Sequence, residues 1–466
     1  MVQRRYIAMK TTKNLTEGNI YRNLLLYAIP MILSSFFSLA YSTIDAVIAG
    51  KFISENALGA ISATGSLDTT LLSLVGGVSA GFAIYVSQIF GKGDFASLRR
   101  DIFSIATVLS CIAVLVSTAI IIFRAPIMQY LKVDPILQKD AETYLVIYSA
   151  GYVIIFLNSL LSSALHALGI TAFALYLSPL SAVLNIAGNL LSVVVLRWGV
   201  AGIALSTLFS ALVCTVVYLL ILKKAFRELK ISDASLRFSL SSITKSLRYT
   251  VPTALQQASF HGVSLFIAPA INALGAAATT GYNVSNRIYS LCTPCLWAAT
   301  SAFACYTAQC VGEGNSKKIR RGVKVGFLMN ILMMLPFVLI FSCFARPIVA
   351  IFFPDGFRGD AYQYAVRYAS IFLPLVYIQV IQHVLHAYMR SLGRVGTVLF
   401  ITLLGSIIRV AATLLLIPTM QLDGAFVGQI ISWTVDTAVS VALYLFLYRT
   451  EDHLNRVIAS LPVSKR

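Results

Sequence analysis

Twelve apolar runs, each long enough to cross a bilayer as a helix, follow one another along the 466-residue chain. Hydrophobic residues make up 58% of the sequence and charged residues 12%, which is far more apolar surface than one soluble core can bury. The sequence therefore predicts an all-α, multi-pass membrane protein. The runs span residues 24–50, 60–90, 102–123, 141–167, 170–196, 199–222, 246–274, 276–310, 323–345, 361–389, 395–417 and 423–448.

Lysine and arginine lie mainly in the gaps between these runs. With the N-terminus inside, most of them fall in the tails and the even-numbered loops, in clusters at 92–100, 223–248, 317–324 and 390–394. Since basic loops stay in the cytoplasm, both termini are predicted to be cytoplasmic in a bacterial cell membrane, with no cleaved signal peptide. The net charge of +18 then reflects topology and contact with the bilayer, so we expect no nucleic-acid partner.

The second half of the chain repeats the first. "ALGAISATG" at 57–65 recurs as "ALGAAATTG" at 273–281, and "SQIFGKGDFASLRR" recurs as "AQCVGEGNSKKIRR". Six helices are duplicated in the same orientation, because six is an even number. Parallel repeats with a central site between them are a common transporter plan. We expect an N-terminal six-helix lobe over 1–222, a basic cytoplasmic linker over 223–245 and a C-terminal six-helix lobe over 246–466.

Motifs spread over both halves resemble one family. "TIDAVIAGKFISENALGAISATG", "ALHALGITAF" and "LNIAGN" in the first half, with "VPTALQQASF" and "MRSLGR" in the second, resemble the multidrug and toxic compound extrusion (MATE) family, nearer its DinF-like bacterial branch. The resemblance runs from about residue 15 to 450. It implies a two-lobed antiporter that exports organic cations or other amphipathic compounds in exchange for protons or sodium, by alternating access.

Asp45 is the only charged residue between Leu24 and Gly50, in the first apolar run. An aspartate at the centre of a membrane helix costs about 2.5–3.5 kcal/mol, and such acids usually mark ion or proton pathways. The resemblance assigns Asp45 to cation coupling, because it falls on the first-helix acid that MATE proteins use. A helix cap or salt bridge is the alternative. Pro30, on the same predicted helix, is a candidate hinge, although most prolines in membrane helices are simple kinks.

The resemblance adds Asn185, Asn189 and Thr207 to the cation-coupling site. In the family pattern Asn-x-x-x-Asp the second position is Asn189 here, so the second acid is missing. Four residues apart on a helix, Asn185 and Asn189 can present two carbonyl oxygens to one point, or they can simply bond to neighbouring helices. Sodium gains from carboxylate charge, so a site with one acid favours protons over sodium.

Polar side chains inside other apolar runs are candidates for the substrate cavity. Amides and aromatic rings can bind flat, weakly charged compounds by hydrogen bonds and stacking, whereas helix packing is the alternative for each residue. The candidates are Asp68, Gln256, Gln257, His261, Asn283, Arg287, Gln379, His383 and Arg409.

Metal-binding and enzymatic arrangements have weaker support. His383 and His386 lack a third ligand at convincing spacing, and Cys292 and Cys295 lie within an apolar run, so we expect no metal, no cofactor and no disulfide framework. An intramembrane acyltransferase would need an acid at the H-x-x-x-x-D spacing, which neither His261 nor His386 has. We therefore expect a monomeric transporter rather than an enzyme. A flippase for lipid-linked oligosaccharides is the alternative function.

Overall fold

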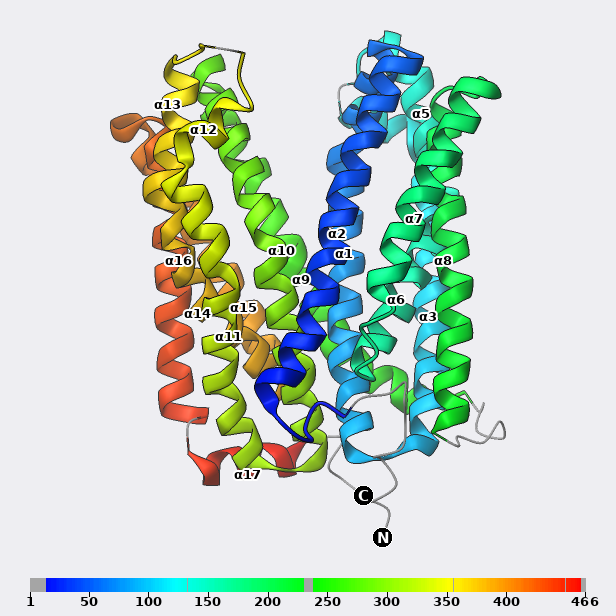
Figure 1. Cartoon of the computed structure of the whole chain (residues 1–466), viewed down its shortest axis with the longest axis vertical. Helices are drawn as coiled ribbons and strands as arrows, with labels where there is room; N and C mark the ends of the chain where they lie inside the picture. The colour runs from blue at the N-terminus through cyan, green and yellow to red at the C-terminus, as the bar shows by residue number, and fades with distance from the viewer. Residues whose placement is uncertain (1–13, 132, 230–237, 355, 449, 462–466) are drawn as a thin grey trace. The chain divides into compact units, whose positions relative to one another are not determined.

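The computed structural model describes residues 14–131, 133–229, 238–354, 356–448 and 450–461. Within these ranges every regular element is helical, and the segments between them are short turns (Figure 1). Residues 1–13 of the predicted N-terminal tail and the last five residues of the C-terminal tail lie outside the described residues, as does the middle of the predicted linker, 230–237.

The first six predicted runs form eight α-helices and two π-helices. A π-helix has a wider turn than an α-helix. One π-helix follows α1 directly and the other follows α7 directly. The elements are α1 (Ile20–Ile48), η2 (Ala49–Ile53), α2 (Glu55–Lys92), α3 (Phe95–Ile122), α4 (Arg124–Tyr130), α5 (Pro135–Ala150), α6 (Tyr152–Ala167), α7 (Ala174–Asn189), η3 (Leu190–Val195) and α8 (Val200–Glu228).

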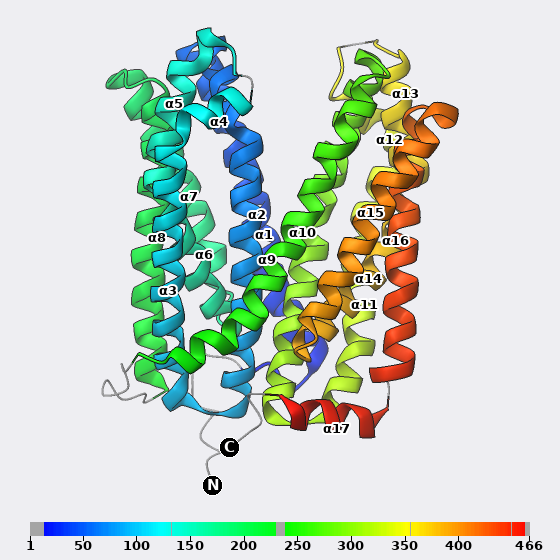
Figure 2. The same ribbon diagram turned by 180° about the vertical axis from the view of Figure 1, so that it is seen from behind.

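The other six predicted runs continue the chain to the C-terminal helix. Figures 1 and 2 show α17 lying across the end of α11, while α15 and α16 pack side by side. The elements are α9 (Leu240–Asn272), α10 (Ala276–Glu313), α11 (Ser316–Cys343), α12 (Ala345–Ala350), α13 (Asp360–Arg367), η5 (Tyr368–Phe372), η6 (Leu373–Leu375), α14 (Val376–Ser391), α15 (Val395–Met420), α16 (Leu422–Leu443), η7 (Tyr444–Tyr448) and α17 (Glu451–Ser460).

The internal repeat appears as matching helix boundaries. Helices α2 and α10 are both 38 residues long, and α3 and α11 are both 28. Each long helix ends at a glycine with positive φ, Gly93 at 74° and Gly314 at 72°. The next residue then caps the following helix, because Asp94 accepts from the backbone N–H of Ser97 and Asn315 accepts from that of Lys318. The repeated "GKGD" and "GEGN" motifs therefore encode the same turn.

The twelve predicted runs coincide with helices, with two refinements. In the described residues ten helices are long and apolar enough to cross a membrane, or eleven if α5 and α6 form one span bent by 46° at Gly151. This broken pair accounts for the predicted run 141–167. The predicted run 246–274 is the continuous helix α9, which falls short on apolarity because serine, threonine, glutamine and basic residues interrupt it.

The helices form two compact units. One unit holds Ile29–Thr250, and the other holds Leu15–Ala28 together with the chain from Val251 onward. Part of the predicted linker is helical, because α8 continues to Glu228 and α9 begins at Leu240. The changes of unit at Ile29 and Val251 therefore fall inside helices, α1 and α9, rather than in loops.

Candidate functional site

A chain of hydrogen bonds joins α1, α7 and α8 of the first unit. Nδ2 of Asn189 donates to Oδ1 of Asp45 over 2.6 Å and lies 3.2 Å from Oδ1 of Asn185. Nδ2 of Asn185 donates to Oγ1 of Thr207 over 3.1 Å. The Thr207 hydroxyl donates to the carbonyl oxygen of Ile203, also over 3.1 Å. The structure thus brings together the four residues assigned to cation coupling by the family resemblance.

Close packing of α7 and η3 against α8 sets this geometry. A Cβ atom on Gly188 would lie 3.0 Å from Cβ of Ser206, and one on Gly202 would lie 2.7 Å from Oγ of Ser192. The hydroxyls of Ser192 and Ser206 are 3.2 Å apart and form a hydrogen bond. The two glycines let the helices approach closely, as small residues do in membrane bundles, so that the Asn and Thr side chains can meet directly.

Two π-helices flank the chain of hydrogen bonds. Helix η3 starts directly after Asn189, and η2 starts at Ala49, four residues after Asp45. Such wide turns are often found at functional sites, where they redirect neighbouring side chains. The sequence patterns did not predict them, because a π-helix has the same apolar composition as the α-helix that it extends.

Asp45 lies at the boundary between this polar chain and an apolar cluster. Asn185 and Asn189 are fully buried, and Asp45 is half-buried. Ile48 at the end of α1 and Val193 of η3 pack into one apolar cluster with residues of α5 and α8. Among the described residues, Oδ1 of Asn189 has no hydrogen-bond donor. A protonated carboxyl group on Asp45 has the O–H donor that this oxygen lacks, so the arrangement can bind a proton.

Asp68 is not part of the hydrogen-bonded series formed by Asp45, Asn189, Asn185 and Thr207. It lies on α2 and is half-buried. Its Oδ1 atom is buried and has no hydrogen-bond partner among the described residues.

The candidate cavity residues of the second half differ in their surroundings. Gln256, Gln379 and His383 are buried, and each contacts neighbouring helices. The hydroxyl of Tyr289 donates to Oε1 of Gln379 over 2.7 Å, and the His383 ring lies edge-on to the ring of Trp297 at 4.9 Å. Gln257 and Arg409 are half-buried, whereas the remaining three are exposed: His261, Asn283 and Arg287.

The candidate hinge Pro30 lies where α1 changes unit. In the second unit, the backbone N–H of Leu15 donates to Oε1 of Gln309 over 2.9 Å, and the Tyr27 hydroxyl donates to Sγ of Cys305 over 3.2 Å. The helix joins the first unit at Ile29. Pro30 follows at once and has no N–H to continue the helical hydrogen bonds.

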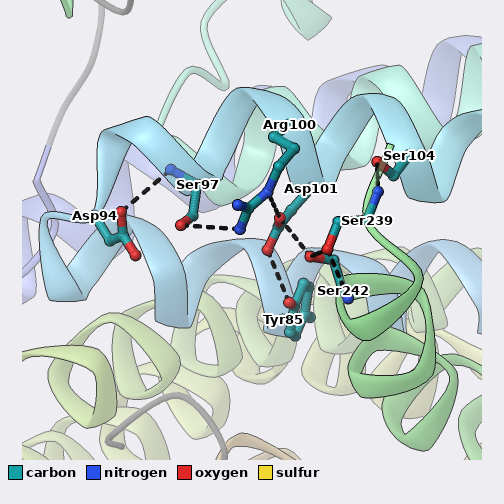
Figure 3. Close-up of polar contacts among 8 residues, drawn as sticks. All are labelled: Tyr85, Asp94, Ser97, Arg100, Asp101, Ser104, Ser239 and Ser242. Atoms are coloured by element: carbon teal, nitrogen blue, oxygen red, sulfur yellow. Dashed lines mark hydrogen bonds and ion pairs between the residues drawn. The ribbon is translucent and has the colours of Figure 1, made fainter. Parts of the chain in front are cut away.

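Helix α9 passes between the units in the opposite order, from the first unit into the second. Its start is held in the first unit by the buried Asp101, which accepts from Tyr85 over 2.9 Å and from Ser242 over 2.6 Å (Figure 3). Ser239 is held by Ser104 in the same place, because its backbone N–H donates to Oγ of Ser104 over 3.1 Å. The helix enters the second unit at Val251, and Pro252 follows. Both crossing helices therefore carry a proline directly after the change of unit.

A hollow of about 1210 Å³ lies on the first unit, between α3, α6 and α8. Apolar side chains line most of it, and Arg99, Lys223 and Arg227 lie at one end. None of the residues hydrogen-bonded to Asp45 or Asn185 lines it. This hollow is therefore separate from the hydrogen bonds that join α1, α7 and α8.

Comparison with known proteins identifies the family. The fold and the repeated helices describe a multi-pass membrane transporter. The MatE family profile matches residues 30–191 and 252–415, one stretch in each repeat and more than half of the chain together. The chain belongs to the MatE family. The resemblance seen in the sequence motifs is therefore confirmed, while the DinF-like branch stays a prediction.

Relatives and solved structures agree with this assignment. The probable multidrug resistance protein YpnP of Bacillus subtilis (strain 168) is 24% identical over 89% of this chain and 91% of its own. A structure described as the outward-facing conformation of a multidrug resistance MATE family transporter matches with a TM-score of 0.85 at 18% identity, over 98% of this chain and 100% of its own. A MATE structure described as the bent conformation matches with a TM-score of 0.83 at 20% identity, over 97% and 98%. At these identities the two structures show the fold.

Proposed function

We propose that the protein is a secondary active antiporter that exports organic cations or other amphipathic compounds in exchange for protons, by alternating access. The observation that carries the proposal is the hydrogen bond from Asn189 to Asp45, beside an Asn189 oxygen that lacks a donor. The names of relatives such as YpnP, a probable multidrug resistance protein, support the substrate class.

Proton exchange at Asp45 would change the contact between α1 and α7. The charged carboxylate accepts a hydrogen bond from Nδ2 of Asn189. The protonated carboxyl group can instead donate to Oδ1 of Asn189, which requires the two side chains to rearrange. Each protonation state therefore favours a different arrangement of α1, and Pro30 supplies the point at which this helix can bend.

Protons are favoured over sodium because of the residue at position 189. Sodium is a hard cation that prefers several oxygen ligands and gains from carboxylate charge. The chain of hydrogen bonds has one acid, Asp45, and an amide at Asn189 where the family pattern has the second acid. A single carboxylate can take up a proton without further ligands.

The basic loops at 92–100 and 317–324 favour the cytoplasmic side for both termini, in a bacterial cell membrane. We propose a monomer as the transporting unit.

Purified protein in liposomes tests the function. Export of a cationic dye should follow an imposed pH gradient and should be much weaker under a sodium gradient alone. Movement of a lipid-linked oligosaccharide without dye export would instead support the alternative function, a flippase. Dye export driven by sodium alone would contradict proton coupling.

A further inference from the structure

A buried charged cluster joins four helices of the second unit. Nε2 of His386 on α14 lies 2.8 Å from Oδ1 of Asp436 on α16, and both side chains are 3% exposed. Oδ2 of Asp436 accepts from Nε2 of Gln382 over 2.6 Å. Nη1 of Arg390 donates to Oε1 of Gln256 on α9 over 3.3 Å. Buried charges are costly unless they are paired, so this cluster needs an explanation.

The hydrogen bonds determine which nitrogen of His386 carries its proton. Arg390 can only donate, so Oε1 of Gln256 must face it. The amide nitrogen of Gln256 then donates to Oγ1 of Thr402 on α15 over 3.1 Å and to Nδ1 of His386 over 3.3 Å. Since Nδ1 accepts, the neutral ring carries its proton on Nε2, beside Asp436. No described residue forms a well-aligned hydrogen bond with Nε2, so its contact with Asp436 is electrostatic.

A second proton on His386 would break the contact with Gln256. The new proton would sit on Nδ1 and turn this atom into a donor facing the amide donor of Gln256. Gln256 cannot satisfy it by turning its amide over, because its nitrogen would then face the Arg390 donor. Asp436 would stabilise the charged ring from the other side.

The charged groups that the cluster brings near His386 lie on α14 and α16. Arg390 and His383 lie on α14 itself, and Asp436 lies on α16, with Oδ1 2.8 Å from Nε2 of His386. Arg409 on α15 and Tyr289 on α10 interact with each other on an adjoining part of the unit. Only the carboxylate of Asp436 lies within ion-pair distance of the ring among the described residues.

The pair is not a product of the internal repeat. The matching motifs "LGITAF" and "LGRVGT" place Ser162 opposite His386, and "VAGIAL" and "LDGAFV" place Cys214 opposite Asp436. Neither residue can form such a charged pair, so the cluster is a property of the second unit.

We propose that His386 is a second proton-binding site, at which protonation of Nδ1 releases Gln256 and with it α9 from α14. Helix α9 is the one that enters the second unit at Val251, next to Pro252 and five residues before Gln256. The site therefore acts on a crossing helix. Its part in transport rests on the proton-coupled function proposed above, whereas proton binding itself does not.

Nuclear magnetic resonance of histidine-labelled protein in lipid nanodiscs tests proton binding directly. The chain has five histidines, so His386 can be assigned by loss of one signal in His386→Gln. Between pH 8 and pH 5 its signal should change from the Nε2–H tautomer to the charged ring. In Gln256→Glu the new carboxylate can accept from both Arg390 and His386, so the ring should stay charged to a higher pH than in the wild type.

His166→Gln, on α6 of the first unit, should remove a different signal and leave the His386 titration unchanged. If the wild-type His386 ring stays neutral down to pH 5, it is not a proton site. If Gln256→Glu leaves its titration in place, the proposed link between the proton and α9 is wrong.

The role in transport has its own measurement. In liposomes, the pH gradient at which net dye export stops gives the number of protons exchanged per substrate. His386→Gln should exchange one proton fewer than the wild type and retain export. An unchanged number would remove His386 from the cycle, even if its ring titrates. Failure of any pH gradient to drive wild-type export would contradict the proposed function instead, and the titration would still decide proton binding.

Discussion

Asn189, the last residue of α7 before the π-helix η3 begins, has its Nδ2 atom 2.6 Å from Oδ1 of Asp45 on α1. The two residues are 144 positions apart in sequence. Their hydrogen bond connects α1, the helix that crosses between units, to the closely packed pair of α7 and α8. A change in the charge of Asp45 therefore acts where the crossing helix is attached to the first unit.

Replacing Asn189 by aspartate should change the coupling ion. The Asn189→Asp variant places a second carboxylate within hydrogen-bond distance of Asp45, which favours a hard cation over a single proton. Dye export in liposomes should then gain a dependence on a sodium gradient. The comparison is made within one preparation, under a pH gradient or a sodium gradient of equal size. A variant that exports as before and ignores sodium would contradict the explanation given for proton preference.

Removing Pro30 should slow export without unfolding the protein. Alanine restores an N–H that can donate to the carbonyl of Leu26, so thermal stability should equal or exceed that of the wild type. The straighter, stiffer helix should reduce the export rate several-fold. Pro252→Ala should act in the same direction, because Pro252 has the corresponding place in α9.

Pro294→Ala is the matched control for both prolines. Pro294 lies inside α10, within one unit rather than at a change of unit. Its replacement should affect export less than either crossing-helix variant. If Pro30→Ala and Pro252→Ala both export at the wild-type rate, neither proline is a hinge.

The close contact between η3 and α8 can be tested through glycine. Gly202→Ala adds a Cβ atom 2.7 Å from Oγ of Ser192, and forced overpacking costs about 1–3 kcal/mol. The melting temperature should fall, and export should fall with it because Thr207 and Asn185 are moved apart. Gly76→Ala on α2 is the control, since its Cβ atom would meet nothing within 4 Å and should leave the melting temperature equal or higher. Equal melting temperatures for the two variants would show that the helix contact is looser than described.

The sequence predicted the helices well because lipid demands long apolar segments. The predicted run 102–123 ends within a residue of α3, and 24–50 matches α1 closely. The predicted run 246–274 is the helix α9, which is polar enough to fall short of a typical span. The apolar composition of the sequence indicates only the length of each membrane-spanning segment. It therefore predicted neither the π-helices nor the changes of unit inside α1 and α9.

The candidate site residues were also predicted in part by sequence motifs, whereas their burial depends on helix packing that the sequence does not give. The family motifs placed Asp45, Asn185, Asn189 and Thr207 in one group, and the structure brings them into contact. Polarity alone grouped residues such as Gln256 and Asn283, of which one is buried and the other exposed. Which way a helix turns its polar face depends on its neighbours. The partner of His386, Asp436, lies 50 residues away and had no local motif.

The central claim is that Asp45 carries the proton that drives export. Purified Asp45→Asn protein in liposomes, under an imposed pH gradient, tests it most directly. The amide is cheaper to bury than a carboxylate, so the variant should fold, bind dye and fail to export it uphill. Asp140→Asn, an acid on α5 of the same unit, should export as the wild type does. Uphill export by Asp45→Asn at a rate near that of the wild type would show that the carboxylate has only a structural role.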